Sequence, residues 1–336
     1  MWTNFYDDFV TFSWDEDAER TGASIELLFD LLGWDFARDG EKALAFDQFF
    51  GALGIHVGLS NFDRGFVEFS NTEKRKLELK ELISSILEAG FLSLPDSLKL
   101  RGRLQFAEGQ LFGRIGKLCL KEITSHAFSS GGGKLGSRLK QLLTLFMTQS
   151  LDGPPKRICG MSASCSFIFT DACYEPGRVD WQCGLGGIIY NSHGAAVQAF
   201  SCALSPDQIA SLGGFVKKTI IFEAELLALI VSFVLWKNLI GNSPVVFYVD
   251  NNSARDVAIS ANSRSKTIAS LVEQLLRVED LASCFCWFAR VPSPSNPADD
   301  PSRGKTEKLL HLGIPFVDVN DIVADCLRKL AEFLIG

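Results

Sequence analysis

The chain has 336 residues, 47% of them apolar, and a formal net charge of −7. This length suits two domains with sizeable hydrophobic cores, and the composition excludes an intrinsically disordered protein. Charge is distributed unevenly, because residues 1–60 carry −9, residues 61–160 carry +6 and residues 161–336 carry −4. A phosphate backbone responds to local charge, so the basic middle third keeps nucleic acid among the candidate partners.

Nothing in the sequence predicts secretion or insertion into a membrane. The nine cysteines form no Cys-x-x-Cys pair, which disfavours a zinc ribbon, and an odd number is typical of reduced thiols inside the cell. The acidic N-terminus lacks the basic and apolar regions of a signal peptide. The longest apolar stretch, 219–240, contains Glu223, Glu225 and Lys237. We therefore expect an intracellular protein, cytoplasmic or nuclear, and not a secreted one.

The first 60 residues predict short strands and one helix. Aromatic and β-branched residues around a pair of aspartates favour a hairpin, and the next segment has the apolar spacing of a helix with Gly33 as its stop. The predicted elements are a hairpin over 2–14 with Asp7 and Asp8 at its turn, a helix over 17–32, and strands over 43–46 and 53–57.

The basic third predicts a helical region. Apolar stripes at helical spacing alternate with Lys and Arg over four segments, and a glycine-rich stretch at 131–133 predicts a flexible break. The helices are expected over 71–89, 95–115, 117–128 and 135–148. Asp152-Gly153-Pro154-Pro155 then breaks the chain and marks a domain boundary.

The pattern beyond this boundary is that of an α/β domain. Three strands are followed by a helix, a strand, two helices, a strand and a last helix, and a further short helix is expected over 322–335. An antiparallel meander followed by alternating elements predicts a mixed five-stranded sheet flanked by helices. The strands are expected over 164–172, 184–190, 195–203, 245–250 and 284–291, and the helices over 220–239, 253–260, 267–281 and from Pro297.

Four acidic residues stand where this order of elements would bring them together. Asp171 and Asp250 end two apolar strands that are neighbours in such a sheet, Glu225 lies beside the apolar stripe of a helix, and Asp299 starts the last helix. Clustered carboxylates repel one another unless a cation lies among them, and hard oxygen ligands select Mg²⁺ or Mn²⁺. Two such ions about 4 Å apart can hydrolyse a phosphodiester without a protein nucleophile.

Alternatives stay open for two of these residues. Asp300 is the rival of Asp299, and Glu223 is the rival of Glu225, although it lies about 200° away around the helix axis. A single aspartate at a strand end is usually a turn former or a cap, and a single helical glutamate is usually solvated. The joint pattern favours the metal site.

Four motifs in this half resemble those of the ribonuclease H domain of retroelement reverse transcriptases. They are Phe169-Thr170-Asp171-Ala172, Ala224-Glu225-Leu226-Leu227-Ala228, Tyr248-Val249-Asp250-Asn251-Asn252 and Asn296-Pro297-Ala298-Asp299-x-x-Ser302-Arg303. The resemblance implies that Asp171, Glu225, Asp250 and Asp299 hold two Mg²⁺ or Mn²⁺ ions. It also implies cleavage of the RNA strand of RNA–DNA hybrids. The loop 291–295 lacks the histidine that many such domains carry, so we expect slower or altered turnover.

The N-terminal half resembles the polymerase part of the same family. Phe5-Tyr6-Asp7-Asp8-Phe9 is similar to the aromatic-x-Asp-Asp motif of the palm, and Leu32-Gly33-Trp34, Lys42 and Phe50-x-x-Leu53-Gly54-Ile55 are similar to later palm motifs. A polymerase needs another metal-binding aspartate and fingers ahead of this motif, and the chain begins almost at the motif. We therefore expect a truncated palm without polymerase activity, with Asp7 and Asp8 as remnants of its site. A polar hairpin turn is the alternative interpretation.

The resemblance divides the chain into five expected regions. Residues 1–60 correspond to the truncated palm, 61–150 to a basic helical thumb or connection, 151–161 to a linker, 162–304 to a ribonuclease H-like domain and 305–336 to a helical tail. Basic residues of the second region are predicted to grip phosphates, as are two asparagines after Asp250; a solvated helix face is the alternative. These residues are Lys74, Lys76, Lys80, Arg101, Arg103, Arg114, Lys117, Lys121, Lys134, Arg138, Lys140, Asn251 and Asn252.

The predicted function is that of a metal-dependent, hybrid-specific ribonuclease whose partners are RNA–DNA hybrids and other retroelement proteins. Two alternatives remain. One is a catalytically silent nucleic-acid-binding or structural remnant of a retroelement, and the other is a nuclease on the same fold that acts on DNA.

Overall fold

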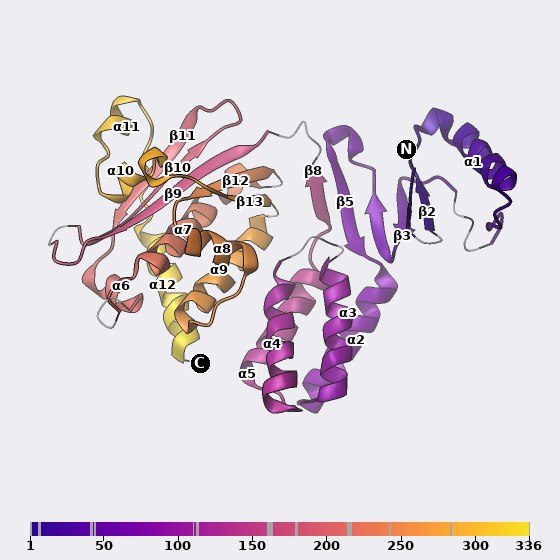
Figure 1. The fold of residues 1–336 in the computed structure, drawn as a ribbon, viewed down its shortest axis with the longest axis horizontal. Helices are drawn as coiled ribbons and strands as arrows, with labels where there is room; N and C mark the ends of the chain where they lie inside the picture. Colours follow the sequence, from indigo (N-terminus) through magenta and orange to yellow (C-terminus); the bar gives the residue numbers. More distant parts are fainter. Residues whose placement is uncertain are drawn as a thin grey trace.

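The computed structural model describes most of the chain. The described residues are 2–5, 8–40, 43, 45–109, 111, 114–159, 164–178, 181–213, 217–241, 243–282 and 284–335. Along the chain, an N-terminal hairpin and helix are followed by a small sheet, by a helical module (residues 73–151) and by a C-terminal module (residues 166–335) (Figure 1). Among these described residues, no helix is long and apolar enough to cross a membrane.

The predicted N-terminal hairpin and helix are both present. Strands β1 (Trp2–Phe5) and β2 (Asp8–Thr11) pair in antiparallel fashion. A 3₁₀ turn (Asp15–Asp17) leads into α1 (Ala18–Leu32), which ends at Gly33 in the left-handed conformation that glycine adopts most easily. Asp8 is the first residue of β2, whereas Asp7 lies outside the described residues.

A four-stranded antiparallel sheet differs from the sequence-based prediction. Its order is β3 (Phe49–Ala52), β4 (Ile55–Gly58), β5 (Phe66–Asn71) and β8 (Lys156–Cys159), with a 3₁₀ turn (Phe62–Arg64) before β5. The strand predicted over 43–46 is wrong, since the described residues there are not in a strand. The expected linker 151–161 contains β8, which pairs with a strand almost 90 positions earlier and so has no local sequence signal.

The helical module contains α2 (Glu73–Ala89), α3 (Leu94–Gly109), α4 (Gly116–Ser130) and α5 (Ser137–Leu145), which continues as a π-helical turn (Phe146–Leu151). Thr72 caps α2 by accepting a hydrogen bond from the Arg75 amide, and Gly90 ends it. The glycine-rich break is not loose, because β7 (Gly132–Lys134) pairs with β6 (Phe91–Ser93). A Cβ on Gly132 would lie 2.5 Å from the Leu94 amide nitrogen.

The sheet of the C-terminal module has the predicted mixed topology. Its order is β11 (Ala196–Ala203), β10 (Cys183–Tyr190), β9 (Ser166–Tyr174), β12 (Pro244–Val249) and β13 (Phe285–Arg290). The first three strands are antiparallel, while β9, β12 and β13 run parallel. The expected α/β fold class, a five-stranded mixed sheet flanked by helices, is confirmed. The strands that end near Asp171 and Asp250 are adjacent.

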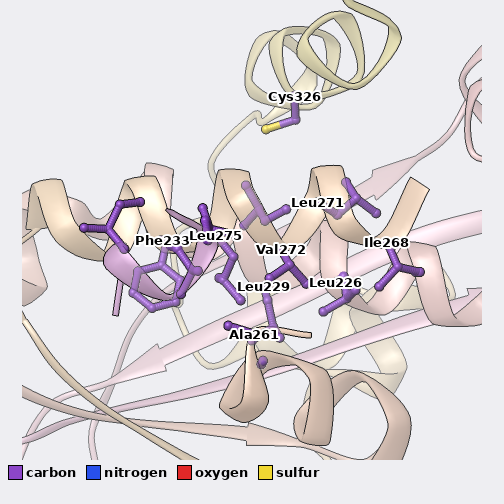
Figure 2. Packing of buried hydrophobic residues seen from close by; sticks show 14 of the residues in the cluster. Leu226, Leu229, Phe233, Ala261, Ile268, Leu271, Val272, Leu275 and Cys326 are labelled. Carbon is purple, nitrogen blue, oxygen red and sulfur yellow. The ribbon is translucent and has the colours of Figure 1, made fainter. Parts of the chain in front are cut away.

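Helices pack on this sheet and form the main core. They are α6 (Pro206–Ser211), α7 (Ile221–Ile240), α8 (Asn252–Ser260), α9 (Lys266–Ala282), α10 (Asp299–Ser302), α11 (Glu307–His311) and α12 (Asn320–Ile335), with a 3₁₀ turn (Ser293–Ser295) before α10. Figure 2 shows Leu226, Leu229 and Phe233 of α7 against Leu271 and Leu275 of α9. The long apolar stretch is thus a buried helix, as expected.

The C-terminal tail belongs to the same core and is not a separate region. Cys326 of α12 faces α9 (Figure 2), and Leu330 is completely buried. Upstream of α12, the Ala199 amide donates to the Pro315 carbonyl at 3.0 Å and the Val317 amide donates to the Ala199 carbonyl at 2.9 Å. The boundary expected at residue 304 therefore does not separate two folding units.

Candidate active site

Three carboxylates from three elements converge at one end of the C-terminal sheet. Oxygen atoms of Asp171, Glu225 and Asp250 all lie within 4.8 Å of one another. The parallel pairing of β9 with β12 sets Phe169 opposite Tyr248, and the two aspartates follow two residues later on each side. Helix α7 packs against β9 and brings Glu225 to the same place.

Asp171 is held in a buried network. Asp171 is only 2% exposed. Its Oδ2 accepts a hydrogen bond from the Ser302 hydroxyl at 2.5 Å, and its Oδ1 accepts one from the side-chain amide of Asn296 at 3.3 Å. Burial raises the pKa of Asp171 to about 7, with Asp250 and Asp299 adding to the shift and the Ser302 hydrogen bond opposing it. The two hydrogen bonds orient the carboxylate.

The ionised form of Glu225 is disfavoured by burial and by two neighbouring carboxylates. Burial raises its pKa well above the usual value, and the charges of Asp171 and Asp250 raise it further, whereas a hydrogen bond from the Ala172 amide opposes the shift. Its Oε2 is buried and has no hydrogen-bond partner among the residues that the structure describes. A buried oxygen without a donor, beside two more carboxylates, fits a divalent cation bound there.

Glu223, the rival of Glu225, lies elsewhere. Its carboxylate forms an ion pair with Lys217 and takes no part in the cluster. Both glutamates are buried. They have different partners because they lie on different sides of the helix axis, and not because their exposure differs.

Asp299 lies at the rim of the site and outside the group of three. It is the first residue of α10, and its carboxylate accepts a hydrogen bond from Arg303 Nε at 3.0 Å. Arg303 also pairs with Glu175 at 2.7 Å. Burial is the main cause of the raised pKa of Asp171, and the charge of Asp299 adds to it. Asp299 stays the predicted fourth acidic residue, with Asp300 as its alternative.

Two glycines of β10 allow α10 to approach the sheet closely. A Cβ on Gly186 would lie 2.4 Å from the Ser302 amide nitrogen and 2.7 Å from the Ala298 carbonyl oxygen. A Cβ on Gly184 would lie 2.1 Å from the Ser302 carbonyl oxygen. Only a strand without side chains at these two positions lets the helix that carries Ser302 and Asp299 reach Asp171.

The structure adds residues to which the sequence analysis assigned no role. Ser302, Asn296 and Arg303 orient the acidic residues, and Glu175 holds Arg303 in turn. The first three were visible in the fourth motif, as a polar pattern around Asp299. Glu175 had no signal, because its contact joins the end of β9 to a residue 128 positions away.

The two asparagines after Asp250 start α8. Asn251 is its cap, with Oδ1 accepting from the Ala254 amide at 3.1 Å, and Asn252 is exposed. Asn251 thus has a structural role in addition to its predicted contact with nucleic acid.

The basic residues predicted to grip phosphates have different environments. Lys74 and Arg103 are exposed on the helical module and Arg101 is half-buried there. Lys76 pairs with Glu73 at 2.8 Å, and Lys80 pairs with Asp152. The charges of Lys74, Arg101 and Arg103 are therefore more available to a polyanion than those of the two paired lysines.

The environment of Arg114 does not fit the phosphate contact that was predicted for this residue. Its guanidinium turns into the protein and donates to both carboxylate oxygens of Glu279 in α9, at 2.9 and 2.7 Å. Arg138 and Lys156 similarly form ion pairs with Glu273 and Asp280 of the same helix. Arg114 and Arg138 of the helical module, and Lys156 of β8, therefore join these parts of the chain to the C-terminal module through the acidic residues of α9.

Comparisons with known proteins find similar solved structures but no related sequence. No protein-family model matches the sequence, and a search of curated proteins finds no relative. Among solved structures, RNase H1 from Halobacterium salinarum shares 14% identity over 43% of this chain and 98% of its own, with a TM-score of 0.33. LC11-RNase H1 in complex with an RNA/DNA hybrid shares 16% over 43% and 99%, with a TM-score of 0.31.

A third similar structure covers more of the chain. A foamy viral protease-reverse transcriptase, denoted dRH and bound to double-stranded DNA, shares 12% identity over 84% of this chain and 44% of its own, with a TM-score of 0.39. Each is a similarity in structure. The four acidic residues and their surroundings, and not these similarities, provide the basis for a function.

Proposed function

We propose that this chain is a metal-dependent endonuclease that hydrolyses the RNA strand of RNA–DNA hybrids, as the ribonuclease H part of a retroelement reverse transcriptase. The observation that carries the proposal is the convergence of Asp171, Glu225 and Asp250 within 4.8 Å, with Glu225 Oε2 buried and without a donor among the described residues. The choice of hybrid as substrate is supported by the resemblance of the four motifs.

The four acidic residues fit two Mg²⁺ or Mn²⁺ ions. Asp171, Glu225 and Asp250 would hold them at the floor of the site, and Asp299 would complete the set at the rim. Divalent ions held by these residues would supply an activated water molecule and stabilisation of the leaving oxygen of the phosphodiester. Oxygen-only ligands make Zn²⁺ a poor alternative.

The residues around the acidic side chains prepare the site. Ser302 and Asn296 each donate to a different oxygen of Asp171, so the carboxylate cannot rotate freely. Burial of Asp171 and Glu225 keeps water away from their charges and strengthens their attraction for a cation. Arg303 donates to the Asp299 carboxylate, and both side chains are partly exposed to solvent.

Three basic residues of the helical module, two exposed and one half-buried, complete the proposal. Lys74, Arg101 and Arg103 supply positive charge without reading base sequence, as expected for a protein that recognises a hybrid by its shape and 2′-hydroxyls. Asn252 is exposed at the start of α8 and lies directly after the Asp250–Asn251 pair, which supports its proposed contact with the same substrate.

A cleavage assay tests the proposal. Wild-type protein is incubated with a labelled RNA–DNA hybrid, duplex DNA or single-stranded RNA, with Mg²⁺ or with EDTA. We expect Mg²⁺-dependent cuts in the RNA of the hybrid alone, and a loss of about 10³-fold or more in Asp171→Asn and Asp250→Asn. Asp256→Asn, an exposed aspartate on α8, is the matched control. Binding of hybrid without cleavage would identify a silent remnant, and cleavage of duplex DNA would identify a different nuclease.

A further inference from the structure

One arginine of the helical module touches three elements of the C-terminal module. Besides its two hydrogen bonds to Glu279 of α9, Arg114 donates to the carbonyl of Ala258, and to that of Ile259 at 3.3 Å. Both carbonyls belong to the last turn of α8. The guanidinium also lies 5.4 Å from the ring centre of Phe288 in β13.

The chemistry of this contact makes it energetically important. The side chains of Arg114 and Glu279 are only 19% and 10% exposed, so removal of either leaves a desolvated charge without its partner. Carbonyls in the last turn of a helix lack partners within the helix, and a positive charge there also interacts favourably with the helix dipole. Arg114 therefore serves as a C-terminal cap of α8 that is supplied by another module.

Helix α8 connects this contact to the candidate active site. Its cap residue Asn251 follows Asp250 directly, and the helix is only nine residues long. Two further contacts join the helical module to this pair of helices. Lys121 Nζ donates to the Ser263 carbonyl, in the corner between α8 and α9, at 2.9 Å, and Arg138 pairs with Glu273 in the middle of α9. In Figure 1 the helical module lies beside this pair of helices.

We propose that Arg114 is a positioning residue for the nuclease reaction: by capping α8 from the helical module, it fixes the helix whose other end sets the place of Asp250. The role in the nuclease reaction rests on the proposed function, whereas the capping of α8 by Arg114 does not depend on it. It replaces the predicted contact of Arg114 with phosphate. Competent binding of divalent ions then depends on docking of the helical module onto α8 and α9.

Hydrogen exchange and metal titration of the full chain test the proposal directly. In Arg114→Met, we expect amides of α8 to exchange at least tenfold faster while those of α2 are unchanged, and the Mn²⁺ affinity to fall about fivefold to tenfold. Arg114→Lys keeps the charge near Glu279 but lacks the planar fork that also reaches α8. It should leave the modules docked and α8 still fast to exchange. Arg20→Met, which removes an exposed arginine of α1, is the matched control.

Steady-state kinetics separate positioning from substrate contact. A positioning role lowers kcat about tenfold and leaves KM within about twofold, because Arg114 does not touch the hybrid. A phosphate contact would instead raise KM and reduce the salt dependence of binding. Unchanged α8 exchange and Mn²⁺ affinity in Arg114→Met, or an effect on KM alone, would overturn the proposal.

Failure of the Arg114→Met variant to fold and failure of the wild-type protein to cleave have different consequences. If Arg114→Met does not fold, Glu279→Gln is measured in the same way, since it weakens the ion pair while keeping a hydrogen-bond acceptor. If wild-type protein cuts no hybrid, the proposed function fails, whereas faster α8 exchange and weaker Mn²⁺ binding in the variant would still support the positioning role. Normal cleavage by Arg114→Met with unchanged exchange would reject the positioning role alone.

Discussion

The C-terminal module and the first 62 residues bury their apolar side chains to very different extents. In the C-terminal module, Phe233 and Phe247 are completely buried, and α12 closes the core over α7 and α9. In the N-terminal region, α1 buries only Phe29, while Leu31 is 77% and Trp14 is 68% exposed. Both regions contain helices with the predicted spacing. Hydrophobic periodicity thus predicts that a helix forms, but it does not predict what covers the apolar face.

Core substitutions should show the largest contrast between the two regions. Leu229→Ala removes a completely buried side chain between α7 and α9 and is expected to lower the free energy of unfolding by about 3–4 kcal/mol. Leu31→Ala on α1 should change it by less than about 0.5 kcal/mol, because that side chain is exposed. Urea unfolding of the two variants measures both values, and equal losses would contradict the contrast.

Gly186→Ala tests how tightly the C-terminal module is packed at the site. The new methyl group would meet the backbone of α10, so we expect a loss of about 2 kcal/mol in unfolding free energy and about tenfold in cleavage rate. Gly102→Ala on α3 is the control, since open space surrounds that position and alanine favours a helix. A Gly186→Ala protein with normal stability and activity would show that α10 can shift without cost.

The pH dependence of stability tests the burial of Asp171 beside other acidic residues. The folded-state pKa of Asp171 is about 7, above the value of about 4 expected in the unfolded chain. A raised pKa stabilises the fold fully below the unfolded value, and this contribution is lost as pH rises through about 7. Without divalent ions, thermal melting should therefore show a lower Tm at pH 8 than at pH 5.5.

Two further melts assign that change to the site. Mg²⁺ should raise the Tm at pH 8 more than at pH 5.5, because protonated carboxyls bind cations poorly. Asp171→Asn should recover on the order of 1–2 kcal/mol at pH 8 without metal. A pH dependence that persists unchanged in this variant would place its origin outside the site.

A comparison of neighbouring aspartates should show the smallest effect. Asp299→Asn is expected to lower hybrid cleavage about tenfold, less than Asp171→Asn, because Asp299 lies at the rim and outside the group of three. Asp300→Asn should stay within about twofold of wild type. Initial rates at saturating Mg²⁺ measure both, and the reverse order would reassign the fourth acidic residue.

Local pattern explains most of what the sequence predicted correctly. The five strands of the C-terminal sheet and α7 to α9 lie within a few residues of their expected positions, since each has its own periodicity and flanking turn. The adjacency of the strands bearing Asp171 and Asp250 followed from the order of elements. The separation of Glu225 from Glu223 followed from helical geometry.

What could not be predicted depends on distant contacts. Strand β8 exists because β5 offers an edge, and a four-residue segment gives no signal of its own. Arg114 and Arg138 look like phosphate-binding residues in a basic region, since sequence shows their charge but not the acidic face of α9 that neutralises it. The role of Gly186 likewise requires knowledge of which helix crosses its strand.

The central claim, that buried carboxylates in the C-terminal module bind divalent ions, is tested most directly by calorimetric titration with Mn²⁺ at pH 8. The account predicts that wild-type protein binds Mn²⁺ and that Glu225→Gln binds it at least tenfold more weakly. Glu223→Gln, two residues away on the same helix, should bind as wild type does. Absence of Mn²⁺ binding by wild-type protein, or equal binding by the Glu225→Gln variant, would contradict it.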